Sequence, residues 1–176
     1  MSAAGIWMRL ARDDAGAAAA EMVLLLPLAG LMLMVTLDAG YFMYTEHEVM
    51  KSVRDAARYG ARQPFAAFNC TAETAEAELP SDSSTLGQIR TNLANLARYG
   101  QLTTTGPLLV PGWTDAQVVV TYSCKASTTG LYAAQQFAPR ITVIAKPTYP
   151  TLFGGGSGFL ASQALFAREQ AVVVGI

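Results

Sequence analysis

Hydrophobic and polar residues are distributed unevenly along this chain, and their pattern predicts a long helix followed by a folded domain. The run from Met22 to Leu37 carries no charge and rises about 24 Å as a helix. Small and aromatic residues on either side extend it over residues 17–45, which is long enough to cross a membrane. Pro27 removes one backbone donor and predicts a bend that neighbouring helices tolerate. We therefore expect one transmembrane helix.

The helix is expected to continue beyond the membrane as an amphipathic segment. Apolar or small residues recur at spacings of three, four and seven, which places on one helical face Phe42, Val49, Val53, Ala56 and Gly60. The helix should end before Pro64, because the residue that precedes a proline avoids the helical region. The pattern thus predicts one continuous helix over residues 17–62, whose second half packs against a globular domain.

Residues 63–176 have the pattern of a small mixed domain. Residues 64–84 are polar and are expected to be irregular. A helix follows over Thr85–Tyr99, capped by Ser84 or Thr85 and ended by Gly100. Its apolar stripe consists of Leu86, Ile89, Leu93 and Leu96.

Alternating valine and tyrosine residues predict strands after this helix. The first strand is expected over Gln117–Cys124 and the second over Arg140–Ala145, with Pro147 and Pro150 marking an edge strand or an exit from the sheet. Residues 154–158 are glycine-rich and predict a flexible loop. The segment Ser162–Val174 fits a helix or a strand, and its final valines favour a closing strand.

These elements predict an α+β fold, in which a long N-terminal helix packs on a small antiparallel sheet with one additional short helix. Charge is sparse in this chain: 14% of the 176 residues are charged, and the formal net charge is −1. Lysine and arginine are scattered, so there is no dense basic patch to release phosphate counterions. We expect no nucleic-acid partner.

The two cysteines, Cys70 and Cys124, lie on the same side of the apolar segment. In an oxidising compartment the simplest outcome is a disulfide, which closes a loop of about 55 residues and contributes about 4 kcal/mol in the chain-entropy model. The alternative is two buried free thiols. Together with the short N-terminal segment, the pair favours an N-terminus inside the cell and a C-terminal domain outside.

The sequence offers no pattern for catalysis. His47 is the single histidine, and Glu46 and Glu48 beside it point to different faces of a helix, so the three do not converge on a metal. No nucleophile-elbow sequence is present, and the glycine run of residues 154–158 lacks the lysine that a phosphate loop requires. We expect no metal, no cofactor and no enzymatic activity.

Glu21 lies at the edge of the uncharged run, and an acidic residue at the centre of a membrane helix costs about 3 kcal/mol. One interpretation is an acid that complements the helix macrodipole near the headgroups. The segment from Gly16 to Glu21 also resembles the processing site of class III signal peptides, found in type IV pilin-like proteins. That resemblance implies cleavage between Gly16 and Ala17, so that Glu21 becomes the fifth residue and the new amine of Ala17 becomes its counter-ion.

Two other interpretations of the N-terminus compete with this one. An uncleaved anchor would keep residues 1–16 attached. A conventional signal peptide would need small residues at a site after the apolar run, but the run ends in Asp38-Ala39-Gly40, which is a poor cleavage site. We favour cleavage after Gly16, with residues 1–16 as a leader.

The chain resembles the TadE-like pseudopilins of the tight-adherence (Flp/Tad) pilus. The residues that carry the resemblance are Gly16, Glu21, Pro27, Asp38, Gly40, Tyr44 and the helix end Ala56-Ala57-Arg58-Tyr59-Gly60-Ala61-Arg62. Tyr149-Pro150-Thr151-Leu152-Phe153 weakly matches the family's proline-rich stretch before its last strand. Where the family commonly has Phe or Tyr after the glutamate, this chain has Met22, which is also large and apolar.

The resemblance implies a minor pilin or pseudopilin that acts in adhesion-pilus assembly, and it applies equally to TadE and to sister pseudopilins. It implies a single-pass protein of the bacterial inner membrane with a cytoplasmic N-terminus and a periplasmic domain. It is also compatible with incorporation of the protein into the pilus. The implied partners are a prepilin peptidase, other pilins contacted through the N-terminal helix, the inner-membrane assembly machinery and membrane lipid. The rival functions are a membrane-anchored periplasmic binding module and a tethered hydrolase.

Overall fold

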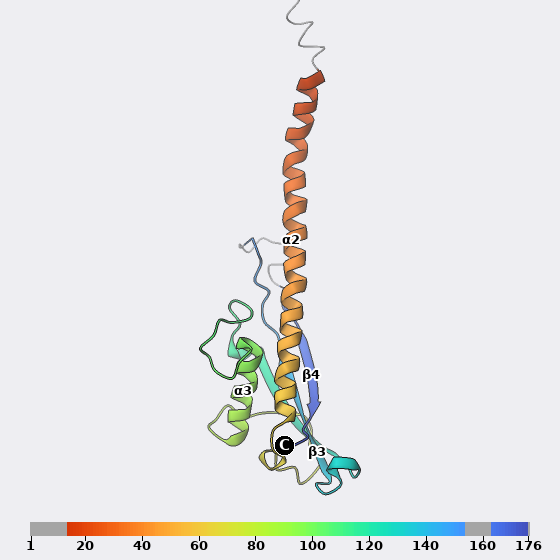
Figure 1. Ribbon diagram of the computed structural model, residues 1–176, viewed down its shortest axis with the longest axis vertical. Coiled ribbons are helices and arrows are strands. Elements are labelled where there is room, and N and C mark those ends of the chain that lie inside the picture. The colour runs from red at the N-terminus through yellow and green to blue at the C-terminus, as the bar shows by residue number, and fades with distance from the viewer. Residues whose placement is uncertain (1–13, 154–162, 176) are drawn as a thin grey trace, which may run out of the picture. The chain divides into compact units, whose positions relative to one another are not determined.

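The computed structural model describes residues 14–153 and 163–175, and the chain forms two compact units, Met1–Gly40 and Tyr41–Ile176. The described part of the first unit is helical throughout. Within the described residues, the second unit holds the end of the same helix, a second helix and a four-stranded sheet (Figure 1). The predicted α+β class is confirmed. In chain order the helices and strands are α2 (Asp14–Ala61), β1 (Ala77–Glu78), α3 (Thr85–Tyr99), β2 (Val118–Ala126), β3 (Phe137–Ala145) and β4 (Ala167–Val172).

The helix α2 is continuous over 48 residues and agrees with the predicted helix to within three residues at each end. Alanine, leucine and methionine, which have high helix propensity, fill its first half. Its end is tightened by a hydrogen bond of 3.1 Å from the Arg62 N–H to the Tyr59 carbonyl. The Ala61 carbonyl accepts a hydrogen bond of 2.7 Å from the Val174 N–H, so the C-terminal segment satisfies a group that a helix end leaves open.

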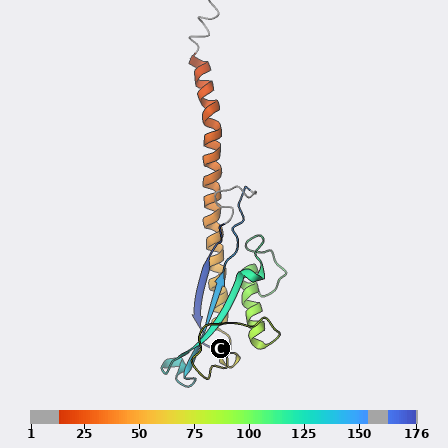
Figure 2. The same cartoon turned by 180° about the vertical axis from the view of Figure 1, so that it is seen from behind.

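The second half of α2 buries the predicted face in the core of the domain. Its buried positions include Val49, Val53, Ala56 and Gly60. Gly60 approaches β3 so closely that a Cβ at this position would lie 3.0 Å from Cδ1 of Ile141. Phe42 extends the contact by packing edge-on against Tyr149, with ring centroids 5.1 Å apart. This half of α2 lies in front of the sheet in Figure 1 and behind it in Figure 2.

The sheet is antiparallel, with the strand order β1-β2-β3-β4. Both predicted strands are confirmed as β2 and β3, which pair along their full length. β3 begins three residues earlier than predicted and includes Pro139. The pairing of β3 with β4 ends at Arg140 and Val172, so the proline lies beyond the part of β3 that pairs with β4, where a proline is allowed. Since β3 is a central strand that ends at Ala145, Pro147 and Pro150 mark an exit from the sheet and not an edge strand.

The prediction that residues 64–84 are wholly irregular is wrong, because they contain the edge strand β1. Both residues of β1, Ala77 and Glu78, are exposed, so the strand has no buried side chain to create an alternating pattern. Main-chain hydrogen bonds hold this segment on β2: the Thr74 N–H donates to the Cys124 carbonyl at 3.0 Å, and the Leu79 N–H donates to the Val120 carbonyl at 2.9 Å.

The last strand confirms the preference for a closing strand over a helix. β4 covers Ala167–Val172 and pairs with β3. Ala164, which fitted the helical alternative, instead forms an isolated bridge with Thr148. Ser162 and the predicted loop over residues 154–158 lie outside the described residues.

The helix α3 has the predicted caps. Ser84 is the N-cap, and its hydroxyl accepts a hydrogen bond of 3.2 Å from the Gly87 N–H. Gly100 ends the helix in the left-handed region, with φ of 68°. Gly87 is required at its position, because a Cβ there would lie 2.0 Å from the Asp82 carbonyl oxygen. Of the predicted apolar stripe, Ile89 and Leu93 are buried, and Leu86 and Leu96 are partly buried.

The predicted disulfide is present between Cys70 and Cys124. It connects the turn after the 3-10 segment Phe65–Ala67 to β2, and it closes a loop with a sequence separation of 54. The same segment is attached to β2 by the hydrogen bond from the Cys124 N–H to the Thr74 hydroxyl, at 2.9 Å. The disulfide therefore fixes the N-terminal part of the irregular segment against the sheet.

Replacing both cysteines with alanine should lower the free energy of unfolding by about 4 kcal/mol, because the unfolded chain then regains the entropy of the open loop. Urea unfolding of the detergent-solubilised full chain measures the change. A reductant should destabilise the wild-type protein to a similar extent and leave the double variant unaffected. Equal unfolding free energies for the oxidised wild type and the variant would contradict a stabilising role for the disulfide.

Candidate functional site: the exposed first half of α2

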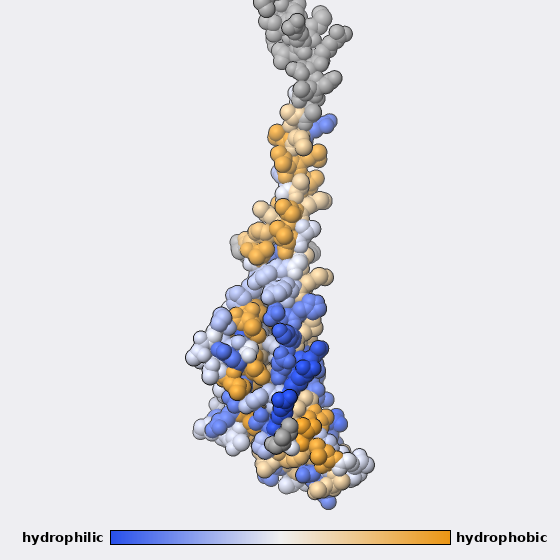
Figure 3. Space-filling model, viewed as in Figure 1, coloured by the Kyte–Doolittle hydropathy of each residue, from blue (hydrophilic) through white to orange (hydrophobic). Residues whose placement is uncertain are grey.

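The first half of α2 exposes large apolar side chains on all sides. From Met22 to Leu37, the large hydrophobic side chains expose between 49% and 76% of their surface. Figure 3 shows part of this surface as orange atoms over the first half of α2. An apolar surface of this extent exceeds the few hundred Å² that a monomeric protein normally exposes to water. Lipid or other apolar helices are therefore its natural surroundings.

The length and composition of α2 agree with this conclusion. Among the described residues, one helix is long and apolar enough to cross a membrane, and it is this one. Thr36 is accommodated because its hydroxyl donates to the Leu33 carbonyl at 2.8 Å. The helix continues through Pro27, whose missing N–H leaves the Val23 carbonyl without its usual intrahelical partner. These features fit a single-pass membrane anchor.

Glu21 lies on α2 with its side chain exposed, and Gly16 lies on the same helix. Among the described residues, and apart from its chain neighbours and the backbone of its own helix, no atom would lie within 4 Å of a Cβ at Gly16. Since α2 begins at Asp14, Glu21 is about two turns from the helix start in the uncut chain. The macrodipole acts mainly within the first turn, so its effect on Glu21 is small at this position. A helix that began at Ala17 would bring Glu21 into its first turns, near a terminal amine.

The other acidic residues and the histidine predicted to matter near the membrane lie further along α2. His47 is exposed, and Glu46, Glu48 and Asp38 are partly exposed. Within residues 14–153 and 163–175, no group of three or more His, Cys, Asp or Glu residues is arranged to hold a metal ion. Cys70 and Cys124 lie in the globular unit as a structural disulfide.

A polar network on the globular unit was not predicted. The Thr121 hydroxyl donates to Oε1 of Glu76 at 2.5 Å, and Nη2 of Arg168 lies 3.2 Å from Oε2 of Glu76. The hydrogen bond from Thr121 is the largest effect and lowers the pKa of Glu76. Desolvation opposes it, and Thr142 and the charge of Arg168 add smaller lowering effects. Glu76 precedes β1, and its partners lie on β2, β3 and β4, so no local sequence pattern could reveal the network.

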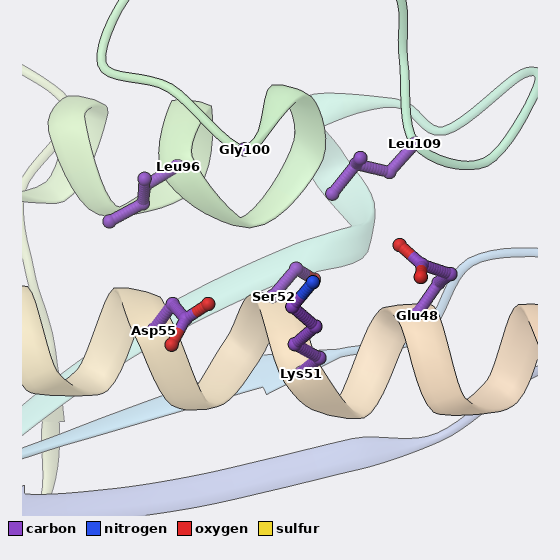
Figure 4. A pocket seen from close by; sticks show the side chains of 7 residues that line it. All are labelled: Glu48, Lys51, Ser52, Asp55, Leu96, Gly100 and Leu109. Atoms are coloured by element: carbon purple, nitrogen blue, oxygen red, sulfur yellow. The ribbon is translucent and has the colours of Figure 1, made fainter.

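A groove between α2 and α3 was also missed. It encloses about 150 Å³ and is lined by Glu48, Lys51, Ser52, Asp55, Leu96, Gly100 and Leu109 (Figure 4). Glu48 and Asp55 point from α2 toward the side where Leu96 and Leu109 lie. Small-molecule sites usually enclose about 300–1,000 Å³. The groove is closer to the size of one long side chain, which does not favour the binding-module alternative.

Comparison with known proteins gives a match over the long helix. The model of the TadE-like protein family matches residues 16–58. Over this helix, the chain is similar to TadE-like proteins. The match begins at Gly16, includes Glu21 and ends within the last turn of α2. It confirms, over the long helix, the resemblance found in the sequence. Searches of curated proteins and of solved structures give no match.

Placing a charge in the exposed apolar half should prevent stable membrane insertion. Leu31 exposes 62% of its surface, and an arginine near the centre of a membrane helix costs about 3 kcal/mol on insertion scales. We expect Leu31→Arg to shift the protein from the alkaline-resistant membrane fraction to the soluble or degraded fraction. Met50→Arg, in the second half of the same helix, is the control and should remain membrane-bound. Full membrane retention of Leu31→Arg would contradict a membrane role for this half.

Proposed function

We propose that this TadE-like chain is a pseudopilin, or minor pilin, that acts in assembly of a Tad-type (Flp) pilus. A prepilin peptidase would cleave it after Gly16 and leave Ala17 as the new N-terminus. One observation carries the proposal: an apolar helix exposed on all sides has a carboxylate, Glu21, five residues beyond Gly16, and the helix continues without a break into a folded domain. The family match over residues 16–58 supports the same assignment.

The proposed location is the bacterial inner membrane, with the N-terminus in the cytoplasm and the domain of residues 63–176 in the periplasm. The Cys70–Cys124 disulfide supports this orientation, because such bonds persist in oxidising compartments such as the periplasm. The exposed apolar half of α2 supports a membrane-embedded state before assembly. The partners are the prepilin peptidase, the inner-membrane assembly machinery, membrane lipid and other pilins. In adhesion, the chain would act through the pilus it helps to build.

In this proposal the chain has a structural role and carries out no catalysis. Assembly transfers the first half of α2 from lipid to a bundle of similar helices, where packing and interhelical polar contacts hold it. Glu21 pairs with the amine of Ala17, either its own at a spacing of four residues or that of a neighbour. Such a buried ion pair specifies the axial register more than it adds net stability.

The test of the proposal is the Glu21→Ala variant. We expect it to be cleaved, folded and retained in the membrane but to fail in assembly, because the register pair is lost. Pili in sheared fractions and on cells, counted by electron microscopy, should fall to the level of a deletion strain. Glu46→Ala, on the same helix but outside residues 17–45, is the matched control and should leave piliation unchanged. Normal piliation with Glu21→Ala would contradict the register role.

A further inference from the structure

The second half of α2 has a basic stripe on the side opposite to its buried face. The stripe consists of His47, Lys51, Arg54 and Arg58, which are all exposed. At 3.6 residues per turn these positions fall within an arc of about 60° and extend about 17 Å along the helix. The buried residues Val49 and Ala56 lie on the far side of the same turns. The stripe is therefore an exposed surface of the folded domain.

One edge of the stripe is flanked by acidic residues. Glu48 and Asp55 are seven residues apart, about two helical turns, and both line the groove between α2 and α3. Leu96 and Leu109 form the apolar part of the same groove (Figure 4). The combination suits a long basic side chain, whose aliphatic stem covers leucine while its charged head meets a carboxylate.

The stripe and the groove are complementary surfaces on one chain. Asp55 already lies 3.8 Å from Arg58 of its own helix, but both side chains are well exposed, and such exposed pairs contribute little. Lys51 lines the groove of its own copy, so Arg54 and Arg58 are the stripe members best placed to reach a neighbour. The two surfaces lie on different sides of α2, so a contact between them joins copies head to tail and continues into a ring or helical array.

We propose that the groove between α2 and α3 of one copy binds the basic stripe of a second copy of this chain, with Arg54 and Arg58 facing Glu48 and Asp55. The proposal rests on the proposed function, since it supplies a lateral contact between subunits beyond their apolar helices. The contact is compatible with parallel neighbouring helices. In packed helices, charged residues at a seven-residue spacing specify the partner and the register.

Charge reversal on two differently tagged full-length copies tests this contact. One copy carries Arg54→Glu and Arg58→Glu, and the other carries Glu48→Lys and Asp55→Lys. When both tagged copies carry the same variant, they should co-purify from detergent-solubilised membranes about fivefold less well than two wild-type copies. This is the effect expected for losing two exposed ion pairs. Mixing the two variants should restore co-purification, because the reversed stripe then meets a reversed groove.

The controls separate this contact from folding and from the apolar helix. Lys125→Glu, on a partly exposed residue of β2, should not change co-purification. The difference between wild type and the variants should shrink in 1 M salt, where the Debye length is about 3 Å. Restoration by the mixture also shows that both variants fold.

Two results would overturn the inference. The first is a mixture that co-purifies no better than either variant alone. The second is that both variants co-purify as well as wild type but no longer support piliation. That result would mean that the stripe contacts a different subunit. In either case, continued cleavage after Gly16 and a continued requirement for the chain in piliation would leave the proposed function standing. Absence of cleavage in wild type would instead count against the proposed function itself.

Discussion

The structure depends on how one helix divides its surface between two environments. Over its first half, α2 exposes apolar side chains on every side, and such a surface is stable only in lipid or among other helices. Over its second half, it buries one narrow face that includes Val53, Ala56 and Gly60, and leaves charged side chains on the other. Because the helix is continuous over Asp14–Ala61, a single element both anchors the chain and supplies the core of its folded domain.

The globular unit is built around the buried face of α2. Gly60 permits close approach of α2 to Ile141 of β3, and the end of the helix is closed by the hydrogen bond from the Val174 N–H to the Ala61 carbonyl. The C-terminal segment after β4 thus supports the C-terminal end of α2. The Cys70–Cys124 disulfide attaches the connecting segment to β2. The groove lined by Ser52 and Leu109 lies at the edge of this unit, between α2 and α3.

Local patterns in the sequence were sufficient to predict much of this fold. The helix lengths, the caps Ser84 and Gly100, the central strands and the closing strand all follow from spacing and from turn residues. β1 could not be predicted, because it is held by main-chain hydrogen bonds and buries no side chain. The groove and the Glu76 network could not be predicted either, since each joins residues that only the tertiary fold brings together.

The most direct test of the central claim is the N-terminus of the mature protein. In cells with an active prepilin peptidase, intact mass or N-terminal sequencing should show a chain that begins at Ala17, with Glu21 as its fifth residue. A Gly16→Leu variant in the same cells should keep its leader and provide the reference mass for the uncut chain. Recovery of the wild-type protein with its leader still attached would contradict the account.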